Sequence, residues 1–163
     1  MFLISENKNG DLTCEEVNVL NLTSNQIHIF CSLNKELEEN QKQYCADLNK
    51  FDSNSGKPTK IIKDIITKRG NLYFFRKNDN IIGFAITKPG MTNHVFVIDK
   101  LFIKNEFRNS GYGTELLTKL ETHLKDKYKC RRLMTNCLGD NPANTFYSKN
   151  GFTPEAITYS KNI

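Results

Sequence analysis

The sequence predicts a protein of the α/β (α+β) class, with a mixed, mostly antiparallel central sheet flanked by helices. Two runs rich in aromatic and β-branched residues, 72–76 and 81–86, flank a polar turn, which is the pattern of a β-hairpin. A third apolar run, 94–103, is followed by a glycine turn and then by leucines at helical spacing. A fourth run, 133–138, comes after that helix. Strands and helices in this order favour a sheet with helices packed on its faces.

The size and composition of the chain fit one domain that spans residues 1–163. A hydrophobic content of 38% and a charged content of 25% are ordinary for a water-soluble protein. No apolar run approaches the roughly 18–20 residues that cross a bilayer. The first residues turn polar too early for a signal peptide. We therefore expect a cytoplasmic protein with no membrane partner.

The cysteines, histidines and net charge exclude several classes of function. Five cysteines are widely spaced without a C-x-x-C pair, and three histidines form no ligand pattern, so we expect reduced thiols and no metal site. The net charge of +5 suits an acidic ligand. The lysines are scattered, however, whereas a nucleic-acid-binding protein concentrates its charge.

The N-terminal third predicts one strand and two helices. Alternating apolar residues predict a half-buried strand within 14–22, and Thr23 and its neighbours provide the capping group of a long helix. A loop at 52–58 precedes a second helix, 59–68, with Pro58 in its first turn. The apolar stripe of the long helix is formed by Ile27, Phe30, Leu33, Leu37, Tyr44 and Leu48.

The remaining strands complete the predicted sheet. Pro89 ends the second hairpin strand, and the run 94–103 continues the antiparallel meander. The run 133–138 would lie beside it. We expect a final segment, residues 156–160, to close the sheet.

The turn after residue 103 has the features of a phosphate-binding site. It carries Arg108 and then the glycines Gly111 and Gly113, immediately before the leucine helix. The first amides of a helix lack partners and its dipole favours an anion, while glycines let backbone approach a ligand. An ordinary strand-to-helix turn would look the same, so this motif alone is weak. It lacks the lysine of a Walker loop and the third glycine of a dinucleotide fingerprint.

A second motif makes the match more specific. Asn141 precedes a short helix with Phe146-Tyr147, and Gly151-Phe152 follow it. In its order and separation from the glycine turn, this pattern resembles the GNAT superfamily of acetyl-CoA-dependent N-acetyltransferases. The resemblance covers roughly residues 72–160.

The resemblance implies how acetyl-CoA, the co-substrate, would bind. In the family the strands equivalent to 94–103 and 133–138 splay apart, and the pantetheine arm enters the gap. Main-chain groups of Leu101, Phe102 and Ile103 would pair with that arm. Asn144 departs from the family pattern, in which Ala or Ser is common. The residues expected to complete the cofactor site are Arg108, Asn109, Ser110, Gly111, Tyr112, Gly113 and Thr114 around the pyrophosphate, with Asn141, Asn144 and Tyr147 on the other side.

Two residues are candidates for catalysis. Tyr147 matches the family's general acid, a phenol that protonates the departing thiolate, although an aromatic pair in a helix also packs a core. Asp99 lies two residues before Leu101 and is expected to share a sheet face with it, where it would act as a base through water. Alternatively, Asp99 is a bulge or edge residue facing solvent. Weaker candidates for the base are Glu106, His94 and His123.

The leading hypothesis is therefore an N-acetyltransferase in which a primary amine attacks acetyl-CoA directly in a ternary complex. The acceptor stays open between a small-molecule amine, a protein amine and an aminoacyl-tRNA. The alternatives are a catalytically silent acyl-CoA-binding module of the same fold and a non-enzymatic binder of nucleic acid. The family analogy places the acceptor beside the two N-terminal helices and makes a homodimer an additional expectation.

Overall fold

The computed structural model describes residues 11–44, 57–159, 161 and 163. Within these residues the chain forms a five-stranded sheet in the order β1-β2-β3-β4-β5. Each pair from β1 to β4 is antiparallel, and β5 runs parallel to β4. The elements along the chain are β1 (Leu12–Val17), η1 (Val19–Asn21), α1 (Ser24–Lys42), α2 (Pro58–Thr67), β2 (Asn71–Lys77), β3 (Asn80–Pro89), β4 (Val95–Ile103), η3 (Asn105–Phe107), α3 (Tyr112–Tyr128), β5 (Arg132–Thr135) and α4 (Ala143–Lys149).

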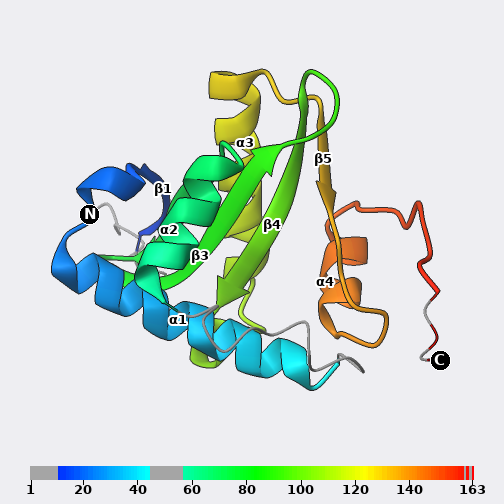
Figure 1. Cartoon of the computed structure of the whole chain (residues 1–163), viewed down its shortest axis with the longest axis horizontal. Helices are drawn as coiled ribbons and strands as arrows, with labels where there is room; N and C mark the ends of the chain where they lie inside the picture. The colour runs from blue at the N-terminus through cyan, green and yellow to red at the C-terminus, as the bar shows by residue number, and fades with distance from the viewer. Residues whose placement is uncertain (1–10, 45–56, 160, 162) are drawn as a thin grey trace, which may run out of the picture.

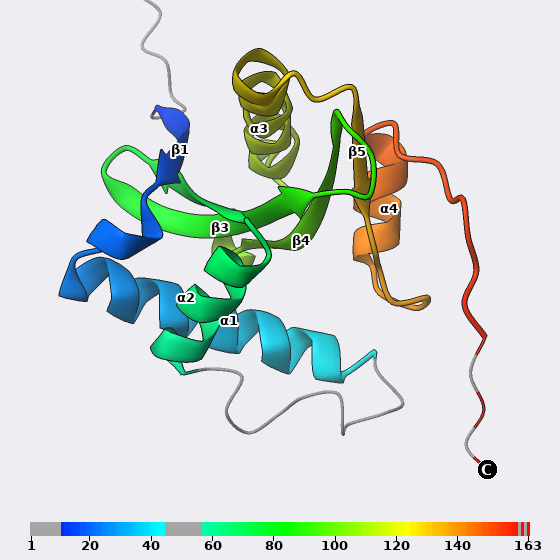
Figure 2. The ribbon, with the colours of Figure 1, turned by 45° about the horizontal axis from the view of Figure 1, so that its top comes forward.

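Helices cover both faces of the sheet. Figures 1 and 2 show α1 and α2 on one face, α3 on the other, and α4 beyond β5 at the end of the sheet. This arrangement confirms the predicted mixed, mostly antiparallel sheet flanked by helices. The strands β4 and β5 are the one parallel pair of this sheet and form its edge on the side of α4.

Each helical layer has its own core. On the α1/α2 face, the Phe30 ring packs edge-on against Phe84 with centroids 5.1 Å apart, and Ile61 and Ile65 of α2 join this core. On the other face, α3 buries the leucines predicted from its helical spacing. These leucines are Leu116, Leu117, Leu120 and Leu124.

The start of α1 follows the predicted capping. The Thr23 hydroxyl accepts a hydrogen bond from the Gln26 amide, and the Gln26 side chain accepts one from the Thr23 amide. Of the predicted stripe, Phe30, Leu33 and Leu37 are buried. The helix ends at Lys42, and Leu48 lies outside the described residues.

Two predicted strands differ from the structure. The first strand begins at Leu12 and ends at Val17, because residues 19–21 turn into η1 before α1. The predicted closing strand is wrong for residues 156–159, which form no strand, while Ser160 lies outside the described residues. Ile157 and Tyr159 are 76% and 88% exposed, so their side chains cover no apolar surface. Strand preference is realised only where such packing exists.

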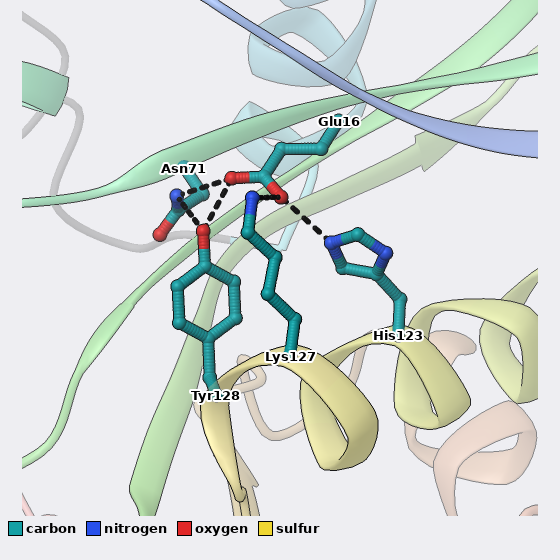
Figure 3. A network of polar contacts seen from close by, with 5 residues as sticks. All are labelled: Glu16, Asn71, His123, Lys127 and Tyr128. Carbon is teal, nitrogen blue, oxygen red and sulfur yellow. Dashed lines mark hydrogen bonds and ion pairs between the residues drawn. The ribbon is translucent and has the colours of Figure 1, made fainter.

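A partly buried carboxylate, that of Glu16, joins β1 to α3 (Figure 3). Glu16 Oε2 lies 2.6 Å from His123 Nε2 and 2.7 Å from Lys127 Nζ. Its Oε1 accepts hydrogen bonds from Tyr128 and from Asn71 of β2. Burial alone would raise the pKa of Glu16, but hydrogen bonds from Lys127, Tyr128 and His123 lower it to about 2. His123, one of the weaker candidates for the base, is therefore part of this structural link.

We expect Glu16→Gln to destabilise the protein at neutral pH by about 2 kcal/mol, a value that allows for partial solvent screening of the charge. The pKa of Glu16 in the folded protein is about 2, below its ordinary 4.5. The stabilisation is therefore present above about pH 4.5 and is lost as the pH falls towards 2. Urea unfolding across this pH range would show the gap between wild type and variant closing in acid.

The neighbouring Glu15 provides the control, because its half-exposed carboxylate meets Arg76 at the surface. Glu15→Gln should change the free energy of unfolding by less than about 0.5 kcal/mol. An effect of Glu16→Gln that stays constant from pH 7 to pH 2.5 would contradict the role given to its charge.

Candidate active site

The strands β4 and β5 part halfway along β4. Their ladder runs from Val95 opposite Arg132 to Ile98 opposite Thr135 and stops there. Beyond Ile98, β4 continues to Ile103 with only β3 beside it, and no strand of the described chain pairs with its other side. We call the point where the ladder ends the apex, and Figure 1 shows the two strands diverging along their length. The divergence of these strands that the family resemblance predicts is therefore present.

A β-bulge lies at the apex. The β3 ladder steps from Ile98 to Lys100, so Asp99 has no partner in β3. The extra residue turns both Asp99 and Lys100 towards α1 and α2, as their contacts with those helices show. Leu101 and Ile103 pack against the core on the α3 side. The expectation that Asp99 shares their face is wrong, because simple alternation does not hold across a bulge.

Two lysines hold the Asp99 carboxylate. Lys88 Nζ donates to Oδ1 at 2.7 Å, and Lys68 Nζ of the loop after α2 lies 3.7 Å from Oδ2. Burial would raise the pKa of Asp99, but the hydrogen bond from Lys88 and the nearby lysine charges bring it below its usual range. The carboxylate is therefore ionised at neutral pH and is a weak base.

The neighbouring Lys100 is held from α1. Its Nζ donates to Asn34 Oδ1 at 2.7 Å and lies 3.8 Å from Glu38. Asn34 is fully buried and donates to Glu38 at 3.0 Å. The sequence motifs do not single out these residues. One signal in the sequence could have indicated them. Asn34 is a polar residue on the buried face of α1, between Phe30 and Leu37, and a buried polar side chain needs a hydrogen-bond partner.

Asp99 and Lys100 border a cavity of about 170 Å³ between α2 and the strands β3 and β4. Its apolar walls include Ile61 and Ile65 of α2 and Ile86 of β3. Its charged lining consists of Lys60, Asp64, Lys68, Lys88, Asp99 and Lys100.

The N-terminus of α3 has the free amides expected of a phosphate site. Gly111 caps the helix with a φ of 82°, and its carbonyl accepts the first helical hydrogen bond, from Glu115. The amides of residues 112–114 have no acceptor among the residues that the structure describes. A Cβ at Gly111 would meet no atom within 4 Å, so this turn faces open space where an anion would fit. The same turn contains Asn109, with a φ of 59°.

The predicted side chains of the turn have additional local roles. Arg108 Nε donates to the Ile103 carbonyl at 2.7 Å, and its guanidinium lies over the Phe102 ring at 5.1 Å. The Ser110 hydroxyl donates to the Phe107 carbonyl at 3.2 Å. These contacts stabilise the chain between β4 and α3.

The two residues after Gly111 pack inwards. A Cβ on Gly113 would lie 3.1 Å from the ring of Phe146, so this glycine makes room for α4. The Tyr112 hydroxyl accepts a hydrogen bond from Lys77 at 2.7 Å, while Thr114 is exposed.

On the far side of the gap, two asparagines shape the loop before α4. Asn141 Oδ1 accepts a hydrogen bond from the Ala143 amide at 2.9 Å. Asn144 Nδ2 donates to the carbonyls of Leu138 and Gly139, each at 2.9 Å. Both side chains therefore order the loop that connects β5 to α4.

Tyr147 of α4 directs its hydroxyl to the apex. Burial raises the pKa of Tyr147, and a hydrogen bond with the Thr135 side chain acts in the opposite direction. Thr135 in turn donates to the carbonyl of Ile98 at 3.2 Å. The ring also packs against Phe146 and Phe152, with centroids 5.5 Å and 5.3 Å away. Tyr147 thus packs against two aromatic rings and also reaches the apex.

The weaker candidates lie elsewhere. Glu106 is an exposed residue of η3. His94 precedes the first residue of β4, away from the apex, and its Nδ1 lies 3.0 Å from the Lys129 carbonyl.

Three further expectations from the sequence concern the thiols, metal binding and the membrane. Burial raises the pKa of the Cys14 thiol to about 12, so the thiolate is scarce. Within the described ranges, no three His, Cys, Asp or Glu side chains are grouped to hold a metal ion. None of the helices described is long and apolar enough to cross a bilayer.

Solved acetyltransferases share this fold. A GNAT family acetyltransferase from Staphylococcus aureus is 21% identical, with a TM-score of 0.64 over 93% of this chain and 98% of that chain. A ribosomal-protein-alanine N-acetyltransferase from Brucella melitensis is 13% identical, with a TM-score of 0.65 over 93% and 99%. AAC(6')-Iy, in complex with the bisubstrate analogue CoA-S-monomethyl-acetylneamine, is 15% identical, with a TM-score of 0.63 over 94% and 100%.

The acetyltransferase (GNAT) family model matches residues 33–152. The chain belongs to this family, which confirms the resemblance inferred from the glycine turn and the Asn141 and Tyr147 motif. No curated protein sequence matches the chain significantly.

Proposed function

We propose that the protein is an N-acetyltransferase that moves the acetyl group of acetyl-CoA to a primary amine in a direct ternary complex. The observation that carries this proposal is the apex itself. There Tyr147, a phenol with a raised pKa, forms a hydrogen bond with Thr135 at the end of the β5 ladder. Asp99 directly follows Ile98, the last residue of β4 in that ladder.

The residues around the gap fit acetyl-CoA. The free amides of residues 112–114 and the open turn at Gly111 would hold the pyrophosphate, with Arg108 adding positive charge. The β4 edge at 101–103 would pair with the pantetheine arm, because no other strand of the described chain occupies that edge. When bound, acetyl-CoA supplies an acetyl group activated as a thioester, and its transfer forms an amide and releases the thiol.

The proton roles follow from the two environments. A phenol is protonated at neutral pH, and burial raises the pKa of Tyr147 further, so this side chain would have a proton to donate to the departing sulfur. Asp99 is ionised but a weak base, so it would orient the amine or a water molecule instead of holding the proton itself.

The proposed function is tested with acetyl-CoA labelled in its acetyl group. The protein would be incubated with a cell extract, which is then separated into small-molecule, protein and RNA fractions. Transfer to one fraction that is lost with Tyr147→Phe supports the enzyme and identifies the class of acceptor. Binding of acetyl-CoA without transfer to any fraction would favour the silent binding module.

We expect Asp99→Asn to reduce kcat/KM by roughly tenfold at pH 7, within the range for loss of one oriented polar group. The pKa of Asp99 already lies below its ordinary 3.8, so the carboxylate is charged throughout the neutral range. The pH–rate profile of the wild type above pH 5 should therefore match that of the variant in shape. A limb near pH 6–7 that disappears with Asp99→Asn would show that Asp99 acts as a titrating base.

A further inference from the structure

The cavity beside the apex carries more positive than negative charge. Four lysines and two aspartates line it. Outside this lining, Glu38 lies 3.8 Å from one of these lysines, Lys100. An anion in the cavity would therefore find more lysine donors around it than a cation would find carboxylate acceptors.

The cavity lies next to the proposed reaction centre. Two of its lining residues, Asp99 and Lys100, are the first residues of β4 beyond the point where the β5 ladder ends. A molecule seated in the cavity would therefore lie on the α1/α2 side of the apex. The gap that would hold acetyl-CoA lies on the other edge of the same strand.

One lysine is more available than its neighbours. Lys88 and Lys100 each make a hydrogen bond of 2.7 Å, to Asp99 and to the buried Asn34. Lys68 lies 3.7 Å from Asp99, and its side chain is 49% exposed. Lys68 can therefore turn towards an incoming anion. Because Lys88 keeps its hydrogen bond to Asp99, the Asp99 carboxylate stays paired when Lys68 binds the anion.

We propose that this cavity is an anion subsite of the acceptor, so that the acceptor is an amine carrying a carboxylate or a phosphate. Lys68 is the residue that binds the anionic group, and the cavity selects against polyamines. This inference rests on the proposed N-acetyltransferase function, since that function makes the occupant of the cavity an acceptor.

The binding of small anions tests the subsite without any turnover. The full-length, isotope-labelled protein would be titrated with inorganic phosphate and, separately, with acetate while amide NMR shifts are recorded. The expected result is saturable shifts at Gly70 and Asp99, with affinity lowered about fivefold or more by Lys68→Gln, as for loss of a charge-assisted contact. Lys63→Gln is the matched control, since Lys63 is an exposed residue of α2, the helix that ends just before Lys68, and does not line the cavity. Equal affinity in wild type and Lys68→Gln would overturn the proposal.

Turnover with matched amines tests the substrate class. Phenylalanine is compared with phenylalaninamide, and O-phosphoethanolamine with ethanolamine, with spermidine as the cationic acceptor. We expect kcat/KM to be at least about tenfold higher for the anionic member of one pair, and this preference to shrink in Lys68→Gln. The pair that responds distinguishes a carboxylate from a phosphate. A preference for spermidine would overturn the inference.

The two arms separate this inference from the proposed function. Intact anion binding together with no transfer either to these amines or to any fraction of the cell extract would contradict the N-acetyltransferase and leave the anion site standing. Transfer without any discrimination by charge, together with unchanged binding in Lys68→Gln, would contradict the subsite and leave the N-acetyltransferase standing.

Discussion

Tyr147→Phe should lower kcat by about 100-fold or more and leave the dissociation constant of acetyl-CoA within about twofold of wild type. The substitution removes one hydroxyl that reaches the apex beside Thr135, and it keeps the ring packed between Phe146 and Phe152. The loss should therefore appear in the chemical step. Steady-state kinetics and calorimetric titration with acetyl-CoA would separate the two effects.

Tyr159→Phe is the matched control, because Tyr159 is 88% exposed in the C-terminal segment and has no place in the proposed site. It should behave as wild type. If Tyr147→Phe turned over as fast as the parent, the phenol would be assigned to core packing alone. A fall in kcat accompanied by a clear drop in the melting temperature would also argue for a structural role.

Gly111→Glu should weaken acetyl-CoA binding by about 100-fold or more, since a carboxylate would be placed where the pyrophosphate is expected. The open space around Gly111 means that the new side chain has room but would repel an anion at the α3 N-terminus. Calorimetry with acetyl-CoA measures this loss directly. Unchanged affinity would remove this turn from the cofactor site.

The backbone of Gly111 makes controls necessary. Its φ of 82° strains any other residue, and Gly151 has nearly the same geometry, with a φ of 85° and open space where a Cβ would lie. Gly151→Glu therefore adds the same charge and strain at the end of α4, and it should retain acetyl-CoA binding. Gly111→Asn adds no charge, and asparagine tolerates this conformation, so it should lose much less affinity than Gly111→Glu.

The elements that the sequence predicted well are those whose structure depends on residues close together in the chain. The hairpin of β2 and β3, the α1 cap at Thr23 and the leucine face of α3 all depend on spacing along a short stretch. The segment 156–159 failed for the opposite reason. A strand forms only where another strand and a core receive it.

The candidate site was predictable in part. The motifs placed Gly111 at a helix start with free amides and Tyr147 on a helix that reaches the apex, as the structure shows. The packing of Gly113 against Phe146 could not be read from the chain, because the two residues lie on different helices. The face of Asp99 was also missed, since a bulge is defined by the partner strand and not by the residues that form it.

By itself, the sequence determined the family, the strand–turn–helix unit around Gly111 and the helix that carries Tyr147. These features are local, so residues close in the chain suffice to specify them. Only the tertiary structure decided that Asp99 is held by Lys68 and Lys88, that Lys100 is fixed by Asn34, and that their charges surround one cavity. Those groups come from α1, the end of α2, β3 and β4. Their proximity depends on how the helices pack against the bulged strand, and no spacing along the chain encodes it.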